Sequence, residues 1–314
     1  MAAELSRVVV LSEPARSRLA DVPGLDVVLV DLDDPSSYPS SARAVVTESE
    51  SPQGLARLLA QVEGIEVVQI LSAGVEQWAG ALPEGVSLVN ARGAHGGSTA
   101  EWAVTALLAI RREIPTFVRQ QQQREWTERR SAGLQGAQVV VLGAGDLGEQ
   151  TRLRLAGFGC HTTLVARTAR DGVRPVTDLP ELLPTADAVV VVIPLTDQTR
   201  GLVDAAFLAA LPDGAVLVNA ARGAVVDTDA LVRELSTGRL RAALDVTDPE
   251  PLPPDHPLWT APGVLITPHV GGHTDGSGDR AWAVAREQLL QLADGRRPTN
   301  TVGGDYVGGS SDRA

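Results

Sequence analysis

The sequence predicts an α/β protein with two parallel-sheet domains. Short β-branched runs recur at intervals of about twenty residues through the first third of the chain, and helix-like stretches separate the later ones. A second series of strand-like and helix-like stretches begins at Ala137. This alternation is typical of parallel sheets, because parallel strands need a crossover connection. The length of 314 residues exceeds the usual size of one compact domain, which favours two.

The first series contains five strand-like runs. They are RVVVLS, LDVVLVD, ARAVVTES, EVVQILSA and VSLVNARG, and SPQGLARLLAQV has the pattern of a connecting helix. The stretch from Ser98 to about Gln123 predicts one long helix, with Ser98 as candidate N-cap and Glu101 placed for a capping box. Pro115 is expected to kink that helix or end it. Near the C-terminus, RAWAVAREQLLQLADG predicts an amphipathic helix.

The second series contains six strand-like runs, with crossover stretches between most of them. They are QVVVLGAG, TTLVAR, AVVVVIP, AVLVNAA, AALDV and GVLITPH. Six such strands predict a doubly wound, Rossmann-like nucleotide-binding domain.

A glycine-rich loop directly follows the first strand of this second series. Gly143, Gly145 and Gly148 form the pattern G-x-G-x-x-G, with Asp146 and Leu147 inside it, immediately before a helix-like stretch. The first glycine allows a tight turn, the second lets the backbone approach a pyrophosphate, and the third lets helix and strand pack closely. The free amides of the helix N-terminus then face the phosphates. We therefore expect these five residues to bind a dinucleotide.

The residues after the next strand indicate which dinucleotide is preferred. A site selective for NAD carries an acidic residue about twenty positions after the glycine loop, to hydrogen-bond the ribose 2′-hydroxyl. This sequence has Ala166 there, followed by Arg167, Thr168 and Arg170. Guanidinium groups and a hydroxyl suit an anionic 2′-phosphate, so we expect NADP(H) to be preferred, with NAD(H) possible.

Composition excludes several other classes of function. All 27 basic residues are arginine, which excludes Schiff-base chemistry on lysine, and the net charge of −12 disfavours nucleic acid or an anionic membrane as partner. A single cysteine and five scattered histidines predict no metal site. The N-terminus lacks the pattern of a signal peptide, and no uncharged apolar run is long enough to cross a bilayer, so we expect a cytoplasmic protein.

The sequence motifs, in this order, resemble those of the D-isomer-specific 2-hydroxyacid dehydrogenase family. The resemblance covers residues from about 71 to 272 and rests on LSAGVE, NARGAHGGSTAEWA, VLGAGDLG, VIPLTDQTRGLV, VLVNAARGAVVDTDAL, ALDVTDPEPLPPDHPLW and ITPHVGG. It implies a flavodoxin-like substrate domain of residues 1–97 plus 287–314 and a Rossmann-like dinucleotide domain of residues 98–286, with the catalytic cleft between them. It also implies a homodimer, in which the long helix and its flanks pack between subunits.

The resemblance implies three catalytic residues. The arginine, glutamate and histidine of the family's motifs match Arg222, Glu250 and His269. Reduction of a 2-oxo acid needs a clamp for carboxylate and carbonyl, a hydride donor and a proton donor. Arg222 would supply the clamp and polarise the carbonyl, and His269 would donate the proton in reduction and accept it in oxidation. Glu250 would hydrogen-bond the imidazole and keep it protonated near neutral pH.

Further site residues follow from the same resemblance. The loop that matches LSAGVE implies that backbone amides of Ser72, Ala73 and Gly74 bind the substrate carboxylate. The remaining matches imply contacts with the cofactor by four more residues: Thr99, Pro194, Ala220 and Asp245. Arg92, near the junction of the expected domains, is a candidate for recognising a second anionic group on the substrate.

The resulting prediction is an NAD(P)H-dependent reductase of a small 2-oxo acid, of the glyoxylate/hydroxypyruvate type, which also catalyses the reverse oxidation of the D-2-hydroxy acid. Two alternatives remain open. One is a D-3-phosphoglycerate dehydrogenase, although family members with that activity usually prefer NAD. The other is a dinucleotide-sensing corepressor, because such proteins can retain Arg222, Glu250 and His269.

Overall fold

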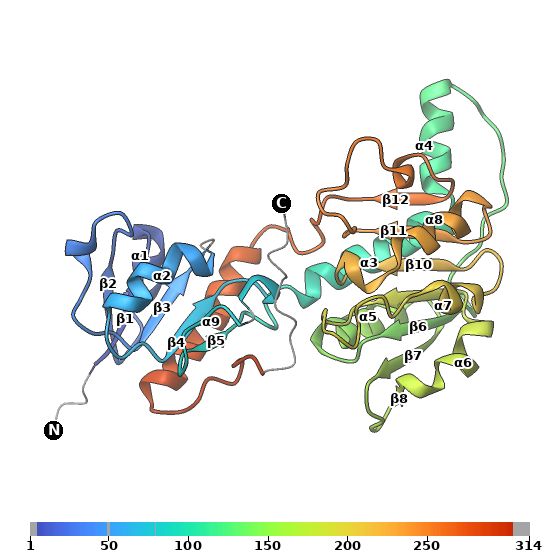
Figure 1. Cartoon of the computed structure of the whole chain (residues 1–314). Helices are drawn as coiled ribbons and strands as arrows, with labels where there is room; N and C mark the ends of the chain where they lie inside the picture. Colours follow the sequence, from blue (N-terminus) through green and yellow to red (C-terminus); the bar gives the residue numbers. More distant parts are fainter. Residues whose placement is uncertain (1–4, 49–50, 79, 304–314) are drawn as a thin grey trace. The chain divides into compact units, whose positions relative to one another are not determined.

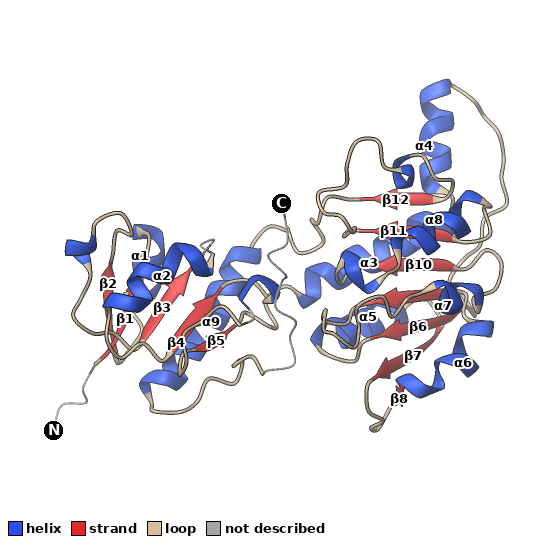
Figure 2. Cartoon of the chain, in the orientation of Figure 1, coloured by secondary structure: helices blue, strands red, loops and turns tan. Residues whose placement is uncertain are grey.

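The structure is a computed structural model that describes residues 5–48, 51–78 and 80–303. It divides into two compact units, residues 1–95 with 275–314 and residues 96–274 (Figure 1). Each unit is built on one fully parallel sheet, so the predicted α/β class with two parallel-sheet domains is confirmed (Figure 2). The second boundary of this division lies at 274/275, whereas the predicted boundary at 286/287 would fall inside a helix.

The first unit has a five-stranded sheet in the order β2-β1-β3-β4-β5. The strands are β1 (Ser6–Val10), β2 (Leu25–Leu29), β3 (Ala44–Thr47), β4 (Val67–Ile70) and β5 (Ser87–Val89). The main helices are α1 (Glu13–Leu19), α2 (Pro52–Gln61) and α9 (Ser277–Ala293). Short 3-10 turns occur at η1 (Pro35–Ser37) and η2 (Glu76–Trp78).

Helices cover both faces of this sheet, because successive residues of each strand point to opposite sides. In β1, Val8 and Val10 pack with residues of α1 and α9, whereas Val9 packs with residues of α2. The helix predicted near the C-terminus is confirmed as α9, which buries Trp282 and Leu289 in the first of these layers.

The second unit has a seven-stranded sheet in the order β12-β11-β10-β9-β6-β7-β8. The strands are β6 (Gln138–Leu142), β7 (His161–Ala166), β8 (Val173–Pro175), β9 (Ala188–Val191), β10 (Val216–Asn219), β11 (Arg241–Leu244) and β12 (Val264–Ile266). The six predicted strands are present, and β8, with the sequence VRP, was not predicted because it is too short and polar to show a period of two.

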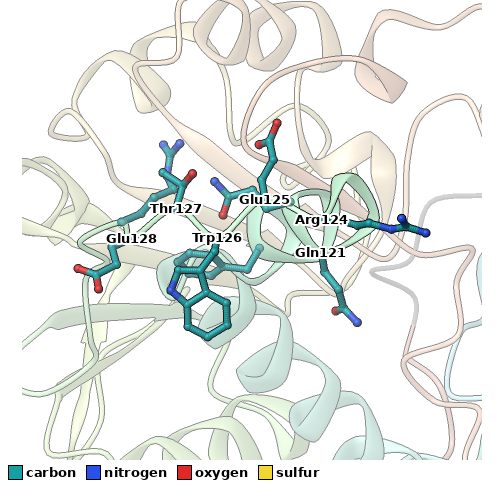
Figure 3. Close-up of a pocket in the computed structure, with 9 residues that line it drawn as sticks. Gln121, Arg124, Glu125, Trp126, Thr127 and Glu128 are labelled. Atoms are coloured by element: carbon teal, nitrogen blue, oxygen red, sulfur yellow. The ribbon is translucent and has the colours of Figure 1, made fainter.

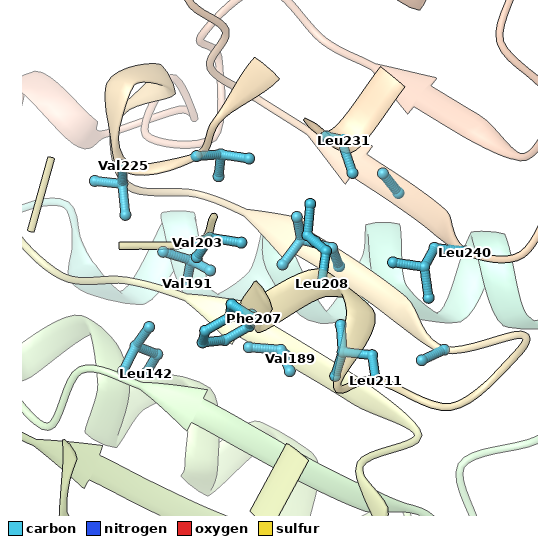
Figure 4. Packing of buried hydrophobic residues seen from close by; sticks show 14 of the residues in the cluster. Leu142, Val189, Val191, Val203, Phe207, Leu208, Leu211, Val225, Leu231 and Leu240 are labelled. Atoms are coloured by element: carbon cyan, nitrogen blue, oxygen red, sulfur yellow. The ribbon is translucent and has the colours of Figure 1, made fainter. Parts of the chain in front are cut away.

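Helices also cover both faces of the second sheet. They are α3 (Gly96–Arg111), α4 (Ile114–Gln123), α5 (Asp146–Ala156), α6 (Leu179–Leu182), α7 (Ala205–Ala209) and α8 (Thr228–Ser236), with short turns η3 (Val176–Asp178), η4 (Leu183–Thr185), η5 (Gly223–Val225) and η6 (Pro257–Trp259). Val189 and Val191 of β9 pack with Phe207, Leu208 and Leu231 on one face (Figure 4). On the opposite face, other residues of β9 pack with α3 and α5.

The helix predicted from Ser98 to about Gln123 is interrupted near Pro115, where a kink or an end was expected, and the chain forms two helices here. α3 ends at Arg111, and Glu113 adopts a left-handed conformation (φ 58°) before α4 begins at Ile114. Pro115 lies at the start of α4, where its missing amide costs no hydrogen bond. The predicted N-cap was wrong, because α3 begins two residues earlier, at Gly96, and Ser98 lies inside it.

Candidate active site

The carboxyl ends of the parallel strands bring most of the predicted site residues to one edge of the seven-stranded sheet. Gly143 follows β6, Ala220 follows β10 and Asp245 follows β11, while Ala166 is the last residue of β7. β6 lies beside β9, its neighbour in the sheet but not in the sequence, so the strand order reverses here. Ligands of doubly wound sheets bind at such a switch point.

The glycine loop has the geometry that a dinucleotide requires. Gly143 has φ +126°, and a Cβ there would lie 2.7 Å from the carbonyl oxygen of Val192. A Cβ on Gly148 would lie 1.9 Å from the carbonyl oxygen of Gly143, so this close contact between helix and strand needs glycine. A Cβ on Gly145 would meet no atom within 4 Å, which leaves open space before the N-terminus of α5. The loop therefore fits the pyrophosphate of a nicotinamide dinucleotide.

The two residues between the second and third glycines begin α5. The carboxylate of Asp146 packs over Gly96 at the start of α3, since a Cβ on Gly96 would lie 1.9 Å from Asp146 Oδ2. The carbonyl of Leu147 accepts a hydrogen bond of 2.8 Å from Thr151 Oγ1 within the same helix. Asp146 thus helps to pack the two helices that flank the loop.

The end of β7 carries cations next to the glycine loop. Arg167, Thr168 and Arg170 are exposed, and Ala166 occupies the position expected for the acid of an NAD-selective site. The guanidinium of Arg170 donates a hydrogen bond to the carbonyl of Ala144, inside the glycine loop. A positive charge therefore lies beside the loop that would hold the phosphates.

Arg222 lies at the end of β10, where a buried asparagine fixes its backbone. Asn219 is 1% exposed, accepts a hydrogen bond from the amide of Ala221 (3.1 Å) and donates one to the carbonyl of Arg222 (3.0 Å). Arg222 Nη1 itself donates to the carbonyl of Ala221 at 2.6 Å. The sequence motif around Arg222 includes Asn219, but its role was not predicted, because asparagine in a strand-end motif signals no chemistry of its own.

At Gly223, the backbone of the segment that carries Arg222 packs directly against the segment that carries Glu250. A Cβ on Gly223 would lie 1.9 Å from the carbonyl oxygen of Thr247 and 2.5 Å from the amide nitrogen of Asp248. The hydroxyl of Thr228 adds a hydrogen bond of 3.0 Å to the carbonyl of Asp248. Direct backbone contact therefore sets the position of the loop that carries Glu250, two residues further on.

The side chains of His269 and Glu250 form a hydrogen-bonded pair. The distance from His269 Nδ1 to Glu250 Oε1 is 2.7 Å, and the two side chains are 46% and 40% exposed. Because a carboxylate can only accept, the imidazole donates from Nδ1, and Nε2 is left to exchange a proton with another group. A carboxylate at this distance holds the ring in a fixed orientation.

Asp245 anchors the segment that carries His269. It is 3% exposed, and its carboxylate accepts three hydrogen bonds, from Thr267 Oγ1 (2.6 Å), the amide of Val270 (2.9 Å) and the amide of Gly271 (2.7 Å). The amide of His269 donates to the carbonyl of Asp245 at 2.7 Å, and His269 has φ 55°. Asp245, expected beside the cofactor, thus holds the loop of His269 through its described contacts.

The other expected cofactor contacts lie on or next to the same edge. Thr99 is in α3, where its methyl group lies 3.4 Å from the position that a Cβ on Gly271 would take. Pro194 is exposed after β9, and its carbonyl accepts from Thr199 Oγ1 at 2.7 Å. Ala220 is 8% exposed, and its amide donates to the carbonyl of Val191.

The loop of Ser72, Ala73 and Gly74 lies in the first unit, after β4. Ser72 Oγ donates to the carbonyl of Gly74 (2.8 Å), and Asn90 Nδ2 donates to the carbonyl of Ala73 (2.8 Å). These bonds use the hydroxyl and the carbonyl groups of the loop. They orient its backbone without occupying the amides of Ala73 and Gly74.

Two further features, a metal site and a membrane-spanning helix, are absent among the described residues. No group of three or more histidine, cysteine, aspartate and glutamate residues in that part of the chain is arranged to hold a metal ion. None of the described helices combines the length and the apolar character needed to cross a membrane.

Comparison with known proteins identifies the family. The family profile described as "D-isomer specific 2-hydroxyacid dehydrogenase, NAD binding domain" matches residues 104–271. A D-3-phosphoglycerate dehydrogenase of Mycobacterium tuberculosis is 33% identical over 315 residues, covering 96% of this chain and 58% of that protein. The chain belongs to the D-isomer-specific 2-hydroxyacid dehydrogenase family. It spans about half of the length, 47–58%, of the curated D-3-phosphoglycerate dehydrogenases that it matches.

Solved structures of the same family match almost the whole chain. A D-isomer-specific 2-hydroxyacid dehydrogenase of Xanthobacter autotrophicus, in complex with NADPH and MES, is 31% identical with a TM-score of 0.82, covering 96% of this chain and 98% of that one. An NADPH-dependent glyoxylate/hydroxypyruvate reductase of Sinorhizobium meliloti, in complex with NADP and sulfate, is 27% identical with a TM-score of 0.80, covering 95% and 98%.

Proposed function

We propose that this protein is an NADPH-preferring reductase of small 2-oxo acids of the glyoxylate/hydroxypyruvate type, which also oxidises the corresponding D-2-hydroxy acid. The observation that carries the proposal is the pair of His269 Nδ1 and Glu250 Oε1 at 2.7 Å, on the same sheet edge as Arg222 and the glycine loop. A proton donor, a guanidinium clamp and a dinucleotide loop are the parts that reduction of a 2-oxo acid needs.

The three catalytic residues divide the reaction among them. Arg222 holds the carboxylate and carbonyl of the substrate with its planar fork and stabilises the negative charge that develops on the carbonyl oxygen. His269 donates the proton on Nε2 to that oxygen, while Glu250 keeps the ring oriented through Nδ1. A nicotinamide dinucleotide held by the glycine loop would supply the hydride to the carbonyl carbon. In the reverse direction, Nε2 accepts the hydroxyl proton.

The preference for NADPH rests on the residues at the end of β7. Ala166 offers no carboxylate to a ribose 2′-hydroxyl, and Arg167, Thr168 and Arg170 offer donors to a 2′-phosphate. The hydrogen bond from Arg170 to the carbonyl of Ala144 keeps one cation beside the glycine loop. The Xanthobacter and Sinorhizobium relatives, which were solved with NADPH and NADP, support this assignment.

The substrate carboxylate is assigned to the loop of Ser72, Ala73 and Gly74. Consecutive backbone amides in a turn form a concave donor site for an anion. Asn90 supports this role, because its hydrogen bond to the carbonyl of Ala73 fixes that peptide without using the amides.

A second copy of the chain is the proposed partner. α4 and the segment after it expose Ile114 (48%), Val118 (46%) and Trp126 (96%). Trp126 also lines a pocket together with residues from the end of α4 and the segment after it (Figure 3). Large exposed apolar side chains on one segment are typical of an interface. We expect light scattering to show a homodimer that Trp126→Asp weakens and that Leu153→Asp, at a 51% exposed position of α5, leaves intact. A monomeric wild type would contradict the assignment.

Initial rates with paired substrates and cofactors test the proposed function. Oxidation of NADPH and of NADH is followed with glyoxylate, hydroxypyruvate and longer 2-oxo acids. We expect turnover that is faster with NADPH. Absence of turnover on all of these acids, with dinucleotide binding intact, would refute the enzyme assignment and favour a dinucleotide-sensing role.

D-3-phosphoglycerate oxidation is the second candidate function, favoured by the 33% identity to the M. tuberculosis enzyme. The same experiment separates the two, because that activity would appear as reduction of NAD with D-3-phosphoglycerate and as a preference for NADH in the reverse direction.

A further inference from the structure

A network of buried polar side chains lies at the carboxyl edge of the five-stranded sheet in the first unit. Asn90 is 6% exposed, Gln288 is 3% and Asn300 is 9%. Asn300 donates from Nδ2 to the carbonyls of Asn90 (3.2 Å) and Arg92 (3.0 Å), and its amide donates to Gln288 Oε1 (2.8 Å). Buried amide side chains are kept where every hydrogen bond has a defined partner, so the network fixes the segments that it joins.

This network fixes the substrate loop and the segment after β5 side by side. β4 and β5 are parallel neighbours, so the loops that follow them meet at the same edge. The amide of Ala91 donates to the carbonyl of Ser72 (2.9 Å), and Asn90 Nδ2 donates to the carbonyl of Ala73 (2.8 Å). Arg92, one residue beyond Ala91, therefore begins next to the loop assigned to the substrate carboxylate.

The side chain of Arg92 is exposed to solvent, but a hydrogen bond to Asn300 holds it in place. Its Nη2 donates to Asn300 Oδ1 at 3.3 Å, and its amide donates to Asn90 Oδ1 at 3.2 Å. Asn300 thus contacts Arg92 through both the carbonyl and the guanidinium. In the part of the chain that the structure describes, no carboxylate forms a salt bridge with Arg92.

A guanidinium oriented by a neutral amide keeps its full positive charge and most of its donors. Arginine has five N–H groups in a planar fork, and the bond to Asn300 uses one of them. Most surface arginines adjust freely, so holding one against a buried asparagine costs side-chain entropy. Such an arrangement suits bidentate recognition of a carboxylate or a phosphate.

We propose that Arg92 is a specificity-determining residue that recognises a second anionic group, a carboxylate or a phosphate ester, at the far end of the 2-oxo acid substrate. The inference rests on the proposed function, because it takes the first carboxylate to lie on the amides of Ser72, Ala73 and Gly74. Asn300 is a positioning residue in this assignment. The assignment adds 2-oxo acids with an acidic side chain to the small 2-oxo acids of the proposed function.

Matched substrate pairs test this assignment and distinguish the two anions. Hydroxypyruvate and 3-phosphohydroxypyruvate differ only by the phosphate, and 2-oxopentanoate and 2-oxoglutarate differ only by the second carboxylate. We measure kcat and KM with NADPH for wild type, Arg92→Met and Arg92→Lys. Arg57→Met, at an exposed arginine of α2, is the control for loss of one positive charge in the same unit.

The wild type is expected to prefer the anionic member of one pair. Arg92→Met should lower kcat/KM for that member by roughly 10- to 100-fold, mainly through KM, because a charge-assisted bidentate contact is lost. It should leave the uncharged member within about twofold. Arg92→Lys should restore part of the preference, since lysine keeps the charge but not the fork. The pair that responds identifies the carboxylate or the phosphate.

Three results would overturn the inference without affecting the proposed function. In the first, the wild type prefers the uncharged member of both pairs. In the second, Arg92→Met loses activity equally on both members of each pair. In the third, Arg57→Met loses as much activity on the anionic member as Arg92→Met does. If no 2-oxo acid is turned over, titration calorimetry of the four acids into the protein with NADP⁺ replaces kinetics. Tighter binding of an anionic member that Arg92→Met removes would then uphold the anion site, and equal binding within each pair would reject it.

Discussion

Gly223→Ala tests whether backbone contact, and not side-chain contact alone, arranges the proposed catalytic residues. Gly223 follows Arg222 directly, and a Cβ on it would lie 1.9 Å and 2.0 Å from the carbonyl oxygen and carbon of Thr247. Both contacts are to backbone, so no side-chain rotation relieves them. The two segments must separate, and these segments carry Arg222 and, three residues after Thr247, Glu250.

The size of the effect follows from the distances. Cβ atoms essentially never approach other atoms closer than 3.0 Å, so the contact of 1.9 Å requires a separation of at least 1.1 Å. A displacement of about 1 Å in a catalytic group can cost roughly 10²-fold in rate. Overpacking of this kind costs about 1–3 kcal/mol, which lowers the melting temperature of a unit of this size by roughly 3–10 °C.

The assay compares kcat/KM for glyoxylate with NADPH, dinucleotide affinity by fluorescence and the melting temperature. We expect Gly223→Ala to lose about 10²-fold in kcat/KM while it still binds NADPH, because the glycine loop lies elsewhere on the sheet. Gly278→Ala is the matched control, since a Cβ there meets no atom within 4 Å and its φ is not positive. Activity of Gly223→Ala within twofold of wild type would refute the idea that this contact positions Arg222 and Glu250.

The remaining predictions concern single side chains. Arg222→Ala should lower kcat/KM with a 2-oxo acid by at least about 10²-fold but leave NADPH affinity unchanged, and retained turnover would remove it from the mechanism. Glu250→Gln should lower kcat for reduction by roughly 10²-fold, because the charge-assisted hydrogen bond that orients His269 is lost; turnover within twofold of wild type would contradict this role. Asp245→Asn places an NH₂ group against one of its backbone donors and should cost about 1.5–3 kcal/mol of stability by calorimetry. Ala166→Asp should shift the kcat/KM ratio toward NADH, and an unchanged ratio would assign the 2′-phosphate to another loop.

The fold could be predicted from the sequence wherever the chain repeats a physical pattern. Buried parallel strands read as β-branched runs, and all six runs from Gln138 onward form strands of one sheet. The break between α3 and α4 was harder, because the helical periodicity continues past it. The turn is made by Glu113 in a left-handed conformation, and glutamate at that position gives no sequence signal for φ 58°.

The sequence predicted that His269 and Glu250 pair in the candidate site. It did not predict which residues hold their segments in position. His269 and Glu250 were expected to pair, and their atoms lie 2.7 Å apart. The roles of Asn219 and Gly223 depend on hydrogen bonds and backbone contacts between segments that are close only in space. Asp245 was assigned to the cofactor from its motif, whereas its three described hydrogen bonds go to residues 267–271.

The residues that support the proposed catalytic groups and the residue that supports the proposed specificity arginine belong to different units. Arg222, Glu250 and His269 are tied to one another through Gly223 and Asp245, all within residues 96–274, so they form one constellation whose geometry does not depend on the substrate side chain. The proposed specificity residue belongs to the other unit and is held by a buried asparagine near the end of the described chain. A change in the second unit should therefore alter the rate for every 2-oxo acid in parallel, whereas a change at the polar network of the first unit should alter the ranking of substrates.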